Sequence, residues 1–211
     1  MYAKNLRSIF TTSSSILGMS LLLASCGSDN ETSPRTQQTI PQLSPAVGTS
    51  IKGSCDDLKS FSFEQTTITT ATLQDAGNLS VANKPIRAHC LVTGHMYSRI
   101  SPVDGQQYQI GFEMRLPLDW NGRFLYQGNG GTDGNIAQAV GNVGSGGPLT
   151  NALYEGFAVI SSDAGHSAQQ NPTFGIDPQA RIDYGYGAIT KLTPMAKNLI
   201  KATYGKTPDR S

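Results

Sequence analysis

A glycine-rich stretch at residues 128–134 restricts the possible folds of this chain more than any other part of the sequence. Its sequence is Gly-Asn-Gly-Gly-Thr-Asp-Gly, and it follows the apolar run Phe124-Leu125-Tyr126 after a single glutamine. Glycine adopts backbone angles that other residues avoid, and it lets a ligand approach the main chain closely. We therefore expect a buried strand that opens into a loop. Such a loop holds a phosphate or offers backbone N–H groups to an anionic oxygen.

Several segments around that loop are predicted to be strands. Residues 108–116 alternate apolar and polar side chains with a period of two, the pattern of a strand with one buried face. Residues 89–93 are a second strand, and the continuous apolar run 157–160 is a third, buried on both faces. A turn at Asn121-Gly122 precedes the strand at residues 123–127.

Two helices are expected after the loop. Pro148–Tyr154 has proline at its first position and Gly156 just past its end. A longer helix follows, with Asp183 as a cap and Gly205 at its end, and Pro194 either kinks it or begins a second helix. The order of strand, helix, strand and helix after antiparallel-looking strands predicts an α/β sheet. The longer helix is indicated by apolar residues at helical spacing, namely Ala188, Leu192, Ala196, Leu199 and Tyr204.

The first 25 residues have the pattern of a bacterial lipoprotein signal peptide. Lys4 and Arg7 precede an apolar stretch at residues 16–24, which is too short to span a bilayer. The sequence Leu23-Ala24-Ser25-Cys26 resembles a lipobox, which would make Cys26 the lipid-carrying first residue of the mature protein. The alternative is an ordinary signal peptide with a cysteine nearby by chance. We expect an exported protein, lipid-anchored in the periplasm or outer membrane, or secreted.

Residues 26–50 are rich in Ser, Thr, Pro and Gln, and predict a flexible tether ahead of a single domain at residues 51–211. Lys4 and Arg7 account for two of the 16 basic residues, so 14 remain after residue 25 against 15 acidic residues. Because the basic residues do not cluster, nothing indicates a nucleic-acid partner. The only membrane contact we expect is the lipid at Cys26.

The chain has three cysteines, an odd number for an exported protein. Lipidation of Cys26 would leave Cys55 and Cys90, and an oxidising compartment would favour a disulfide between them. That bond would close a loop of about 35 residues and stabilise the fold by roughly 3–4 kcal/mol in the chain-entropy account. Two free buried thiols are the alternative.

The glycine stretch fits an oxyanion-binding loop better than a nucleotide-binding loop. A dinucleotide site needs a third glycine where this chain has Asp133, and a P-loop needs a Gly-Lys-Ser/Thr sequence that does not follow. In α/β-hydrolases, the loop after the third strand donates a backbone N–H to the oxyanion. A purely structural turn remains a further interpretation.

A nucleophile for such a loop is not evident in the sequence. No G-x-S-x-G motif occurs, and Gly165-His166-Ser167 lacks the final glycine and the helix of a nucleophile elbow. Ser161 and Ser162 lie at a strand end without elbow glycines.

The histidines show no metal-binding spacing. His89 and His95 carry no signal of a site, and His89 is expected to be structural. His166 follows a predicted strand, where α/β sites form, and is either a loop organiser or a substrate contact. Arg181 would pair with Asp163 or Asp183, or line a pocket.

Four stretches together resemble the tannase and feruloyl esterase family, which includes esterases acting on mono(hydroxyethyl) terephthalate. The resemblance runs from about Cys55 to Ser211. Motifs in the same order are far more specific than a lone glycine pattern. The four are Trp120-Asn121-Gly122-Arg123-Phe124, the stretch 128–134, Ser161-Ser162-Asp163-Ala164-Gly165-His166 and the run 177–186.

The resemblance implies the N-terminal part of an α/β-hydrolase that cleaves small aromatic or phenolic esters. Gly131 matches the glycine whose N–H contributes to the oxyanion hole, and Gly130, Thr132 and His166 are weaker substrate-binding candidates. Cys55 and Cys90 match a family disulfide. The family's catalytic Ser, Asp and His, its lid and the lid's calcium site would follow Ser211, so no metal or cofactor is expected in this portion. A complete lipid-anchored protein that binds ligand without chemistry is the rival interpretation.

Overall fold

The computed structural model describes residues 42–142 and 151–211. Residues 43–211 form one unit, to which all of the following refers. The strands are β1 (Thr49–Ser50), β2 (Thr66–Gln74), β3 (Ser80–Val81), β4 (Lys84–Pro85), β5 (His89–Ile100), β6 (Gln107–Pro117), β7 (Asp119–Trp120), β8 (Phe124–Gln127) and β9 (Ala158–Ser162). The helices are the 3₁₀ turns η1 (Asp56–Ser60), η2 (Ala168–Gln170) and η3 (Thr173–Ile176), the α-helix α1 (Pro178–Ile182), the π-helical turn η4 (Asp183–Gly187) and the α-helix α2 (Ala188–Tyr204).

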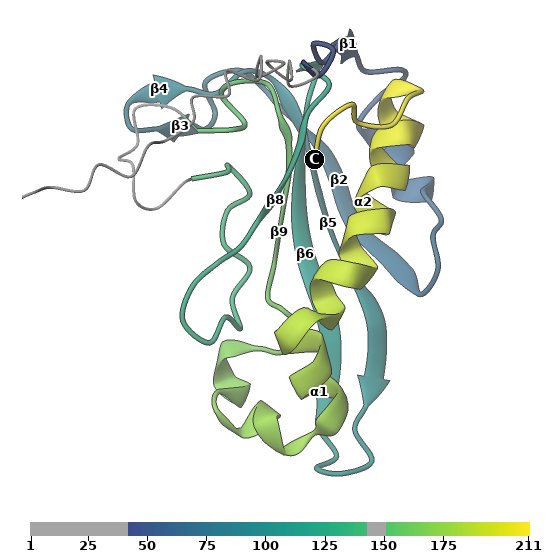
Figure 1. The fold of residues 1–211 in the computed structure, drawn as a ribbon, viewed down its shortest axis with the longest axis vertical. Helices are drawn as coiled ribbons and strands as arrows, with labels where there is room; N and C mark the ends of the chain where they lie inside the picture. The colour runs from purple at the N-terminus through teal and green to yellow at the C-terminus, as the bar shows by residue number, and fades with distance from the viewer. Residues whose placement is uncertain (1–41, 143–150) are drawn as a thin grey trace, which may run out of the picture. The chain divides into compact units, whose positions relative to one another are not determined.

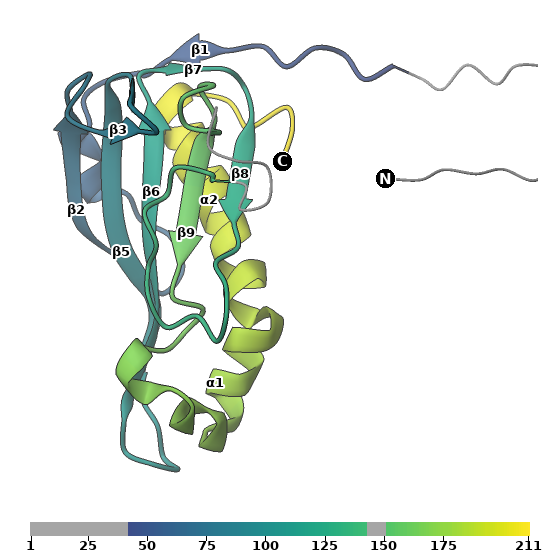
Figure 2. The same cartoon turned by 90° about the vertical axis from the view of Figure 1, so that its left-hand side faces the viewer.

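A five-stranded sheet in the order β2-β5-β6-β9-β8 forms the centre of the fold, as Figure 2 shows. Strands β2 and β5, β5 and β6, and β6 and β9 pair antiparallel, whereas β9 and β8 pair parallel. The sheet is therefore mixed, and it agrees with the expected α/β class. The alternating segment 108–116 lies in β6, and the segment 89–93 begins β5.

Helix α2 lies along one face of this sheet (Figure 1) and closes the main core. It ends at Gly205, whose left-handed φ of 79° is a conformation that glycine adopts without strain. The expected spacing is confirmed, because the helix buries its apolar side chains against strands β5, β6, β8 and β9. The buried helix residues are Ala188, Leu192, Met195, Ala196, Leu199, Ile200 and Tyr204.

A second, smaller apolar cluster includes Val159 of β9. It contains Ile86, Val140 and Leu153, while the neighbouring Ile160 packs in the main core with α2. Strand β9 thus has apolar neighbours on both faces, as the unbroken apolar run at residues 157–160 predicted.

Two helix predictions differ from the structure, and one of the two alternatives for Pro194 is excluded. Within Pro148–Tyr154, residues 148–150 lie outside the described residues, and residues 152–154 form turns instead of a helix. Asp183 does not cap the N-terminus of the helical segment, which already begins at Pro178. The N-terminal cap is Asp177, whose carboxylate accepts from the Ala180 N–H. Helix α2 continues through Pro194, so no second helix begins there.

The folded part begins before Ile51. Thr49 and Ser50, which were expected to end the tether, form β1 and pair with β7. The Val47 N–H donates to Asp209 at 2.8 Å, and Lys206 Nζ donates to the Val47 carbonyl at 2.9 Å. The signal peptide, Cys26 and most of the tether lie outside the described residues.

Cys55 and Cys90 form a disulfide, with their Cα atoms 5.3 Å apart. It ties the start of η1 to β5, and Cys90 is fully buried in the main core. The alternative of two free thiols is therefore wrong for this structure. Among the described helices, none is long and apolar enough to cross a membrane.

Candidate functional site

The glycine stretch lies at the edge of the sheet where the two parallel strands end. It follows β8, and residues 163–166 follow β9, so both loops meet at the carboxyl ends of these strands. This edge is where α/β folds place their ligand sites. Within the stretch, Gly131, Asp133 and Gly134 have φ angles of 67°, 53° and 89°. The prediction that the loop needs unusual backbone angles is confirmed.

Hydrogen bonds hold this loop against β9 and the residues after it. The Asn129 side-chain amide donates to the Ser162 carbonyl at 2.7 Å, and the Gly134 N–H donates to the Asp163 carbonyl at 3.1 Å. A Cβ atom on Gly134 would lie only 2.8 Å from the backbone nitrogen of Ala168. The two ends of the loop are therefore fixed, and its middle projects from the sheet edge.

Gly131 occupies that exposed middle. Its N–H donates to no acceptor in the part of the chain that the structure describes, and a Cβ atom placed on it would meet nothing within 4 Å. Its carbonyl accepts a hydrogen bond from the Tyr184 hydroxyl at 3.2 Å. The neighbouring Gly130 and Thr132 are also exposed. A free amide in an open, anchored loop is suited to an external acceptor such as a developing oxyanion.

A small cavity of about 60 Å³ separates the first half of the loop from the start of α2. Tyr126, Asn129 and Asp133 line one side of it, and Tyr184 and Ile189 line the other. The cavity is too small for an aromatic acid. It therefore marks where the loop meets the helical segment, and it does not enclose a substrate.

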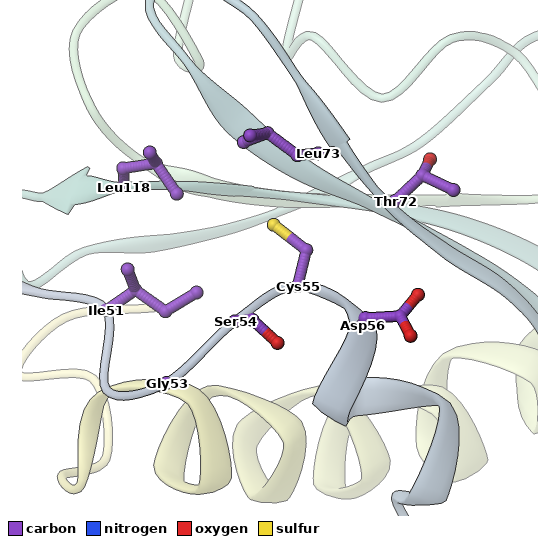
Figure 3. Close-up of a pocket in the computed structure, with 8 residues that line it drawn as sticks. All are labelled: Ile51, Gly53, Ser54, Cys55, Asp56, Thr72, Leu73 and Leu118. Atoms are coloured by element: carbon purple, nitrogen blue, oxygen red, sulfur yellow. The ribbon is translucent and has the colours of Figure 1, made fainter.

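A larger, mainly apolar cavity of about 400 Å³ lies elsewhere, around the disulfide. Figure 3 shows Cys55 directed from residues 53–56 toward the strand that carries Thr72 and Leu73. Its lining holds neither a histidine nor a residue of the glycine stretch. Size alone would favour this cavity, but the chemistry favours the sheet edge.

The three candidate serines all serve local structure. Ser161 is fully buried, and its hydroxyl bonds to the Asn129 side chain at 3.1 Å. The Ser162 hydroxyl bonds to the Tyr126 hydroxyl at 2.8 Å. Ser167 begins η2 and forms a capping box with Gln170. A single 3₁₀ turn follows Ser167, whereas a nucleophile elbow is followed by a helix.

His166 is buried beneath the loop, with 1% of its surface exposed. Its ring stacks on Phe174 at a centroid distance of 3.8 Å, and its Nε2 lies 3.1 Å from Asn171 Oδ1. Asn171 Nδ2 in turn donates to the Asp133 carbonyl at 3.2 Å. These contacts fit the interpretation of His166 as a loop organiser better than that of an exposed substrate contact.

Asp163 is a partly buried carboxylate at the same edge. Its Oδ1 accepts from the Gly111 N–H at 3.0 Å and from the Gly165 N–H at 2.9 Å. Burial raises the pKa of Asp163 to about 7 despite these two bonds, which act in the opposite direction. The carboxylate of Asp133 adds to the rise. The carboxyl group of Asp163 is therefore expected to titrate near neutral pH.

His89 and Arg181, two further residues considered from the sequence, have structural partners. His89 Nδ1 bonds to the Arg87 carbonyl and its Nε2 to Arg115, each at 2.8 Å. Burial lowers the pKa of His89, so its neutral form is favoured. Arg181 was expected to pair with Asp163 or Asp183, but it donates to the backbone carbonyls of residues 175 and 176.

Among residues 42–142 and 151–211, the His95 side chain makes no hydrogen bond. No three His, Cys, Asp or Glu side chains in these ranges are grouped to hold a metal ion.

Reasoning from the sequence missed three residues that shape the loop, namely Asn129, Asn171 and Tyr184. Their bonds to the loop or to β9 join residues 33, 38 and 53 positions apart. Tyr184 lies inside the family-like run 177–186, but its hydrogen bond to Gly131 follows only from the three-dimensional fold. Polar contacts at such separations leave no periodic pattern in a sequence.

The sequence profile of the family described as "Tannase and feruloyl esterase" matches residues 90–211. The matched segment contains the glycine stretch, both parallel strands and helix α2.

Two named relatives are similar over part of their length. The chain is 36% identical over 154 residues to mono(2-hydroxyethyl) terephthalate hydrolase from Piscinibacter sakaiensis, covering 69% of this chain and 25% of that protein. It is 32% identical over 99 residues to a probable feruloyl esterase B-2 from Aspergillus flavus, covering 47% of this chain and 18% of that protein. The chain thus spans about a quarter or less of these two relatives.

Two solved structures share the fold. An esterase from Aspergillus oryzae aligns with a TM-score of 0.56 at 20% identity, covering 72% of this chain and 30% of that one. Feruloyl esterase B from the same organism aligns with a TM-score of 0.55 at 24% identity, covering 72% and 29%. These alignments indicate the same mixed sheet within a much longer chain.

Proposed function

The chain belongs to the tannase and feruloyl esterase family, and from this we propose that it is the N-terminal portion of a carboxylic ester hydrolase. The complete enzyme would cleave esters of aromatic or phenolic acids through a serine acyl-enzyme. One observation carries the proposal. The Gly131 N–H has no acceptor among residues 42–142 and 151–211, and it lies in an anchored loop at the carboxyl edge of the parallel strands.

Gly131 would act on the charge that develops during acylation. When a serine hydroxyl attacks the ester carbonyl, the carbonyl oxygen becomes negative, and the Gly131 N–H would donate a hydrogen bond to it. The alcohol then leaves, and water hydrolyses the acyl-enzyme to release the acid. The serine and its base would belong to the segment after Ser211.

The position of Arg210 supports this arrangement. Arg210 forms a parallel bridge with Arg123, and its carbonyl accepts from the Phe124 N–H at 2.9 Å. A chain continuing from Ser211 would therefore enter the sheet beside β8, next to the glycine stretch. A nucleophile at the end of such a strand would face Gly131 across the sheet edge.

The role of Gly131 is tested in the protein made from the complete coding sequence. We expect Gly131→Ala to lower kcat about a hundredfold on an alkyl ester of a hydroxycinnamic or terephthalic acid, because the φ of 67° disfavours alanine and the N–H would shift. Gly128→Ala is the matched control, since a Cβ atom on Gly128 also meets no neighbour and Gly128 has no positive φ. Equal activity of the two variants would refute the assignment.

The 211-residue chain is expected to be inactive by itself. A fluorophosphonate probe, which modifies activated serines, should leave it unlabelled and should label the complete protein. Labelling of the short chain at Ser167 would overturn the proposed location of the nucleophile.

The rival function is a lipid-anchored protein that binds a ligand without chemistry. The coding sequence discriminates between the two. An in-frame Gly-Cys-Ser sequence shortly after Ser211 supports the esterase, while a stop codon and binding of an aromatic ester without turnover support the rival.

We also propose export with a lipid at Cys26. The Cys55–Cys90 disulfide supports an oxidising compartment. Radiolabelled palmitate should be incorporated by the parent protein in a bacterial host and not by Cys26→Ser. Incorporation by both proteins would exclude Cys26 as the lipidated residue.

A further inference from the structure

Tyr184 makes a hydrogen bond to Gly131 from the far side of the glycine stretch. Its hydroxyl lies 3.2 Å from the Gly131 carbonyl, and the two residues are 53 positions apart. The Gly131 carbonyl belongs to the peptide that follows the candidate oxyanion amide. A bond there restrains ψ of Gly131, and therefore the orientation of that amide relative to the rest of the loop.

The loop needs such a restraint at this point. Four of its seven residues are glycine, which have broad conformational freedom. The hydrogen bonds of Asn129 and Gly134 fix the two ends, but Gly131 is exposed and a Cβ atom there would touch nothing. In the described part of the chain, the Tyr184 hydroxyl is the one side-chain group that bonds to Gly131.

Tyr184 is itself held by aromatic contacts. The Tyr184 ring makes T-shaped contacts with His166 and Phe174, at centroid distances of 5.7 and 5.2 Å. The rings of His166 and Phe174 stack on each other. His166 reaches the same loop through Asn171, whose Nδ2 donates to the Asp133 carbonyl. Because Nδ2 of Asn171 is the donor in that bond, the atom that faces His166 is the amide oxygen Oδ1, which can only accept. His166 therefore donates from Nε2. The cluster of His166, Phe174 and Tyr184 is therefore linked to the loop on both sides of Thr132. Tyr184 bonds to Gly131 directly, and His166 is linked to Asp133 through Asn171.

The helical segment that carries Tyr184 is also fixed. Tyr184 lies in the π-helical turn η4, a geometry that is rare and often occurs at functional sites. Its neighbour Asp183 is buried and accepts from Lys191 Nζ at 2.6 Å and from Gln179 Nε2 at 3.1 Å. The turn thus presents the tyrosine from a rigid base.

We propose that Tyr184 is a positioning residue, whose hydroxyl holds the Gly131 peptide so that its N–H is oriented for the anionic oxygen before substrate arrives. This inference rests on the proposed esterase function. Tyr184 does not touch the reacting atoms in this arrangement. It lowers the reorganisation of a flexible loop during the reaction, which is the general advantage of a preorganised oxyanion site.

The test compares Tyr184→Phe with Tyr186→Phe in the protein made from the complete coding sequence. The first variant loses the hydroxyl and keeps the ring contacts. Tyr186 lies in the same turn, is 62% exposed, and its hydroxyl bonds to nothing among residues 42–142 and 151–211. We expect Tyr184→Phe to lower kcat about tenfold with KM unchanged, and Tyr186→Phe to match the parent.

A second readout separates positioning from general stability. An aromatic boronic acid, which forms a tetrahedral anionic adduct with a serine, should bind Tyr184→Phe about tenfold more weakly. The planar carboxylate product should bind all three proteins equally. A parallel loss of boronic acid and carboxylate binding, or no loss of either, would overturn the inference.

Hydrogen exchange tests the anchoring without any reliance on activity. Amides of residues 128–134 should exchange faster in Tyr184→Phe than in the parent or in Tyr186→Phe. Unchanged exchange refutes the inference, even if the parent is an active esterase. A parent that hydrolyses no aromatic ester refutes the proposed function, and faster exchange in that case would show a tyrosine that anchors a non-catalytic loop.

Discussion

Within the glycine stretch, the structure requires glycine for different reasons at Gly134 and Gly131, and at Gly130 for none. Gly134 has both a positive φ and close neighbours, since a Cβ atom would lie 2.8–2.9 Å from Ala168 and Asn171. Gly131 has the positive φ alone, and Gly130 has neither constraint. Conformation and packing therefore require Gly134, conformation alone favours Gly131, and Gly130 is exchangeable as far as folding is concerned.

Replacing Gly134 by alanine should lower the free energy of unfolding by roughly 2–3 kcal/mol, because a strained φ and a steric clash with the backbone add. Gly130→Ala should change it by less than about 0.5 kcal/mol. Urea denaturation monitored by fluorescence measures both values. Similar stabilities for the two variants would contradict the close packing of Gly134 against Ala168.

The raised pKa of Asp163 makes stability depend on pH. The folded protein keeps the proton on Asp163 up to a pH of about 7, whereas an unfolded aspartate, with its ordinary pKa of 3.8, loses it near pH 4. The folded state thus binds more protons between these values, and stability falls as the pH rises through that window. Above pH 7 this contribution to the free energy of unfolding is lost completely. At about 1.4 kcal/mol per pKa unit, the loss is roughly 4 kcal/mol.

Asp163→Asn should flatten this pH dependence and leave the variant at least as stable as the parent at pH 8. The asparagine oxygen can still accept from the N–H groups of Gly111 and Gly165. Thermal melts between pH 4 and pH 8 measure the effect, with the exposed Asp75→Asn as control. A parent whose stability rises with pH over that range, by an amount that Asp163→Asn removes, would contradict the raised pKa.

At the scale of elements, the start of the helical segment is tied to the sheet by an ion pair. Arg99 of β5 donates to both carboxylate oxygens of Asp177, at 3.0 and 2.5 Å, and Asp177 also caps α1. The bonds from Arg99 hold the pKa of Asp177 well below its usual range. The carboxylate therefore stabilises the fold above the unfolded pKa, and this contribution is lost as the pH falls.

Asp177→Ala should destabilise the protein by roughly 2–4 kcal/mol, since it removes a helix cap and leaves a partly buried arginine unpaired. Asp177→Asn should cost less, because the amide oxygen can still cap the helix. Asp56→Ala, which breaks an exposed pair with Lys59, should cost less than about 1 kcal/mol. Guanidinium denaturation ranks the three, and an equal cost for Asp177→Ala and Asp56→Ala would contradict the role given to the buried pair.

Sequence patterns predicted the elements with strong apolar periodicity and missed those without it. Strand β6 and helix α2 were predicted from alternation and helical spacing. Strand β2 was not, because its sequence TTITTATLQ buries one residue fully and lies at the sheet edge. The cap at Asp177 was assigned to Asp183, because its partner Arg99 lies 78 residues away. At the site, the glycine stretch was evident from composition, but Tyr184 depends on tertiary contacts.

At the scale of the whole molecule, β8 is one of the two edge strands of the sheet. Apart from β9 and the bridge to Arg210, it has no strand partner in the described residues. An open edge of this kind promotes association with other chains. This open edge runs along the strand that begins at Phe124, since β9, which follows Phe157, lies between β6 and β8.

The 211-residue chain without its signal peptide should therefore associate or precipitate at micromolar concentration, whereas the protein from the complete coding sequence should remain monomeric. Analytical ultracentrifugation of the two proteins side by side measures the difference. A soluble monomer of the short chain with a sharp two-state melt would count against both the open edge and the proposed continuation.

The contacts of residues 44–47 with residues 206–210 bear on the order of folding. The Val47 N–H bonds to Asp209 and the Ser44 carbonyl to Arg210, across 162 and 166 positions. Closing a loop of that length is entropically costly, so such contacts form after the local hairpins. During vectorial synthesis, these hydrogen bonds of residues 44–47 form only after residues 206–210 have emerged. A protease cut near these residues would therefore report how far the chain has progressed toward its finished fold.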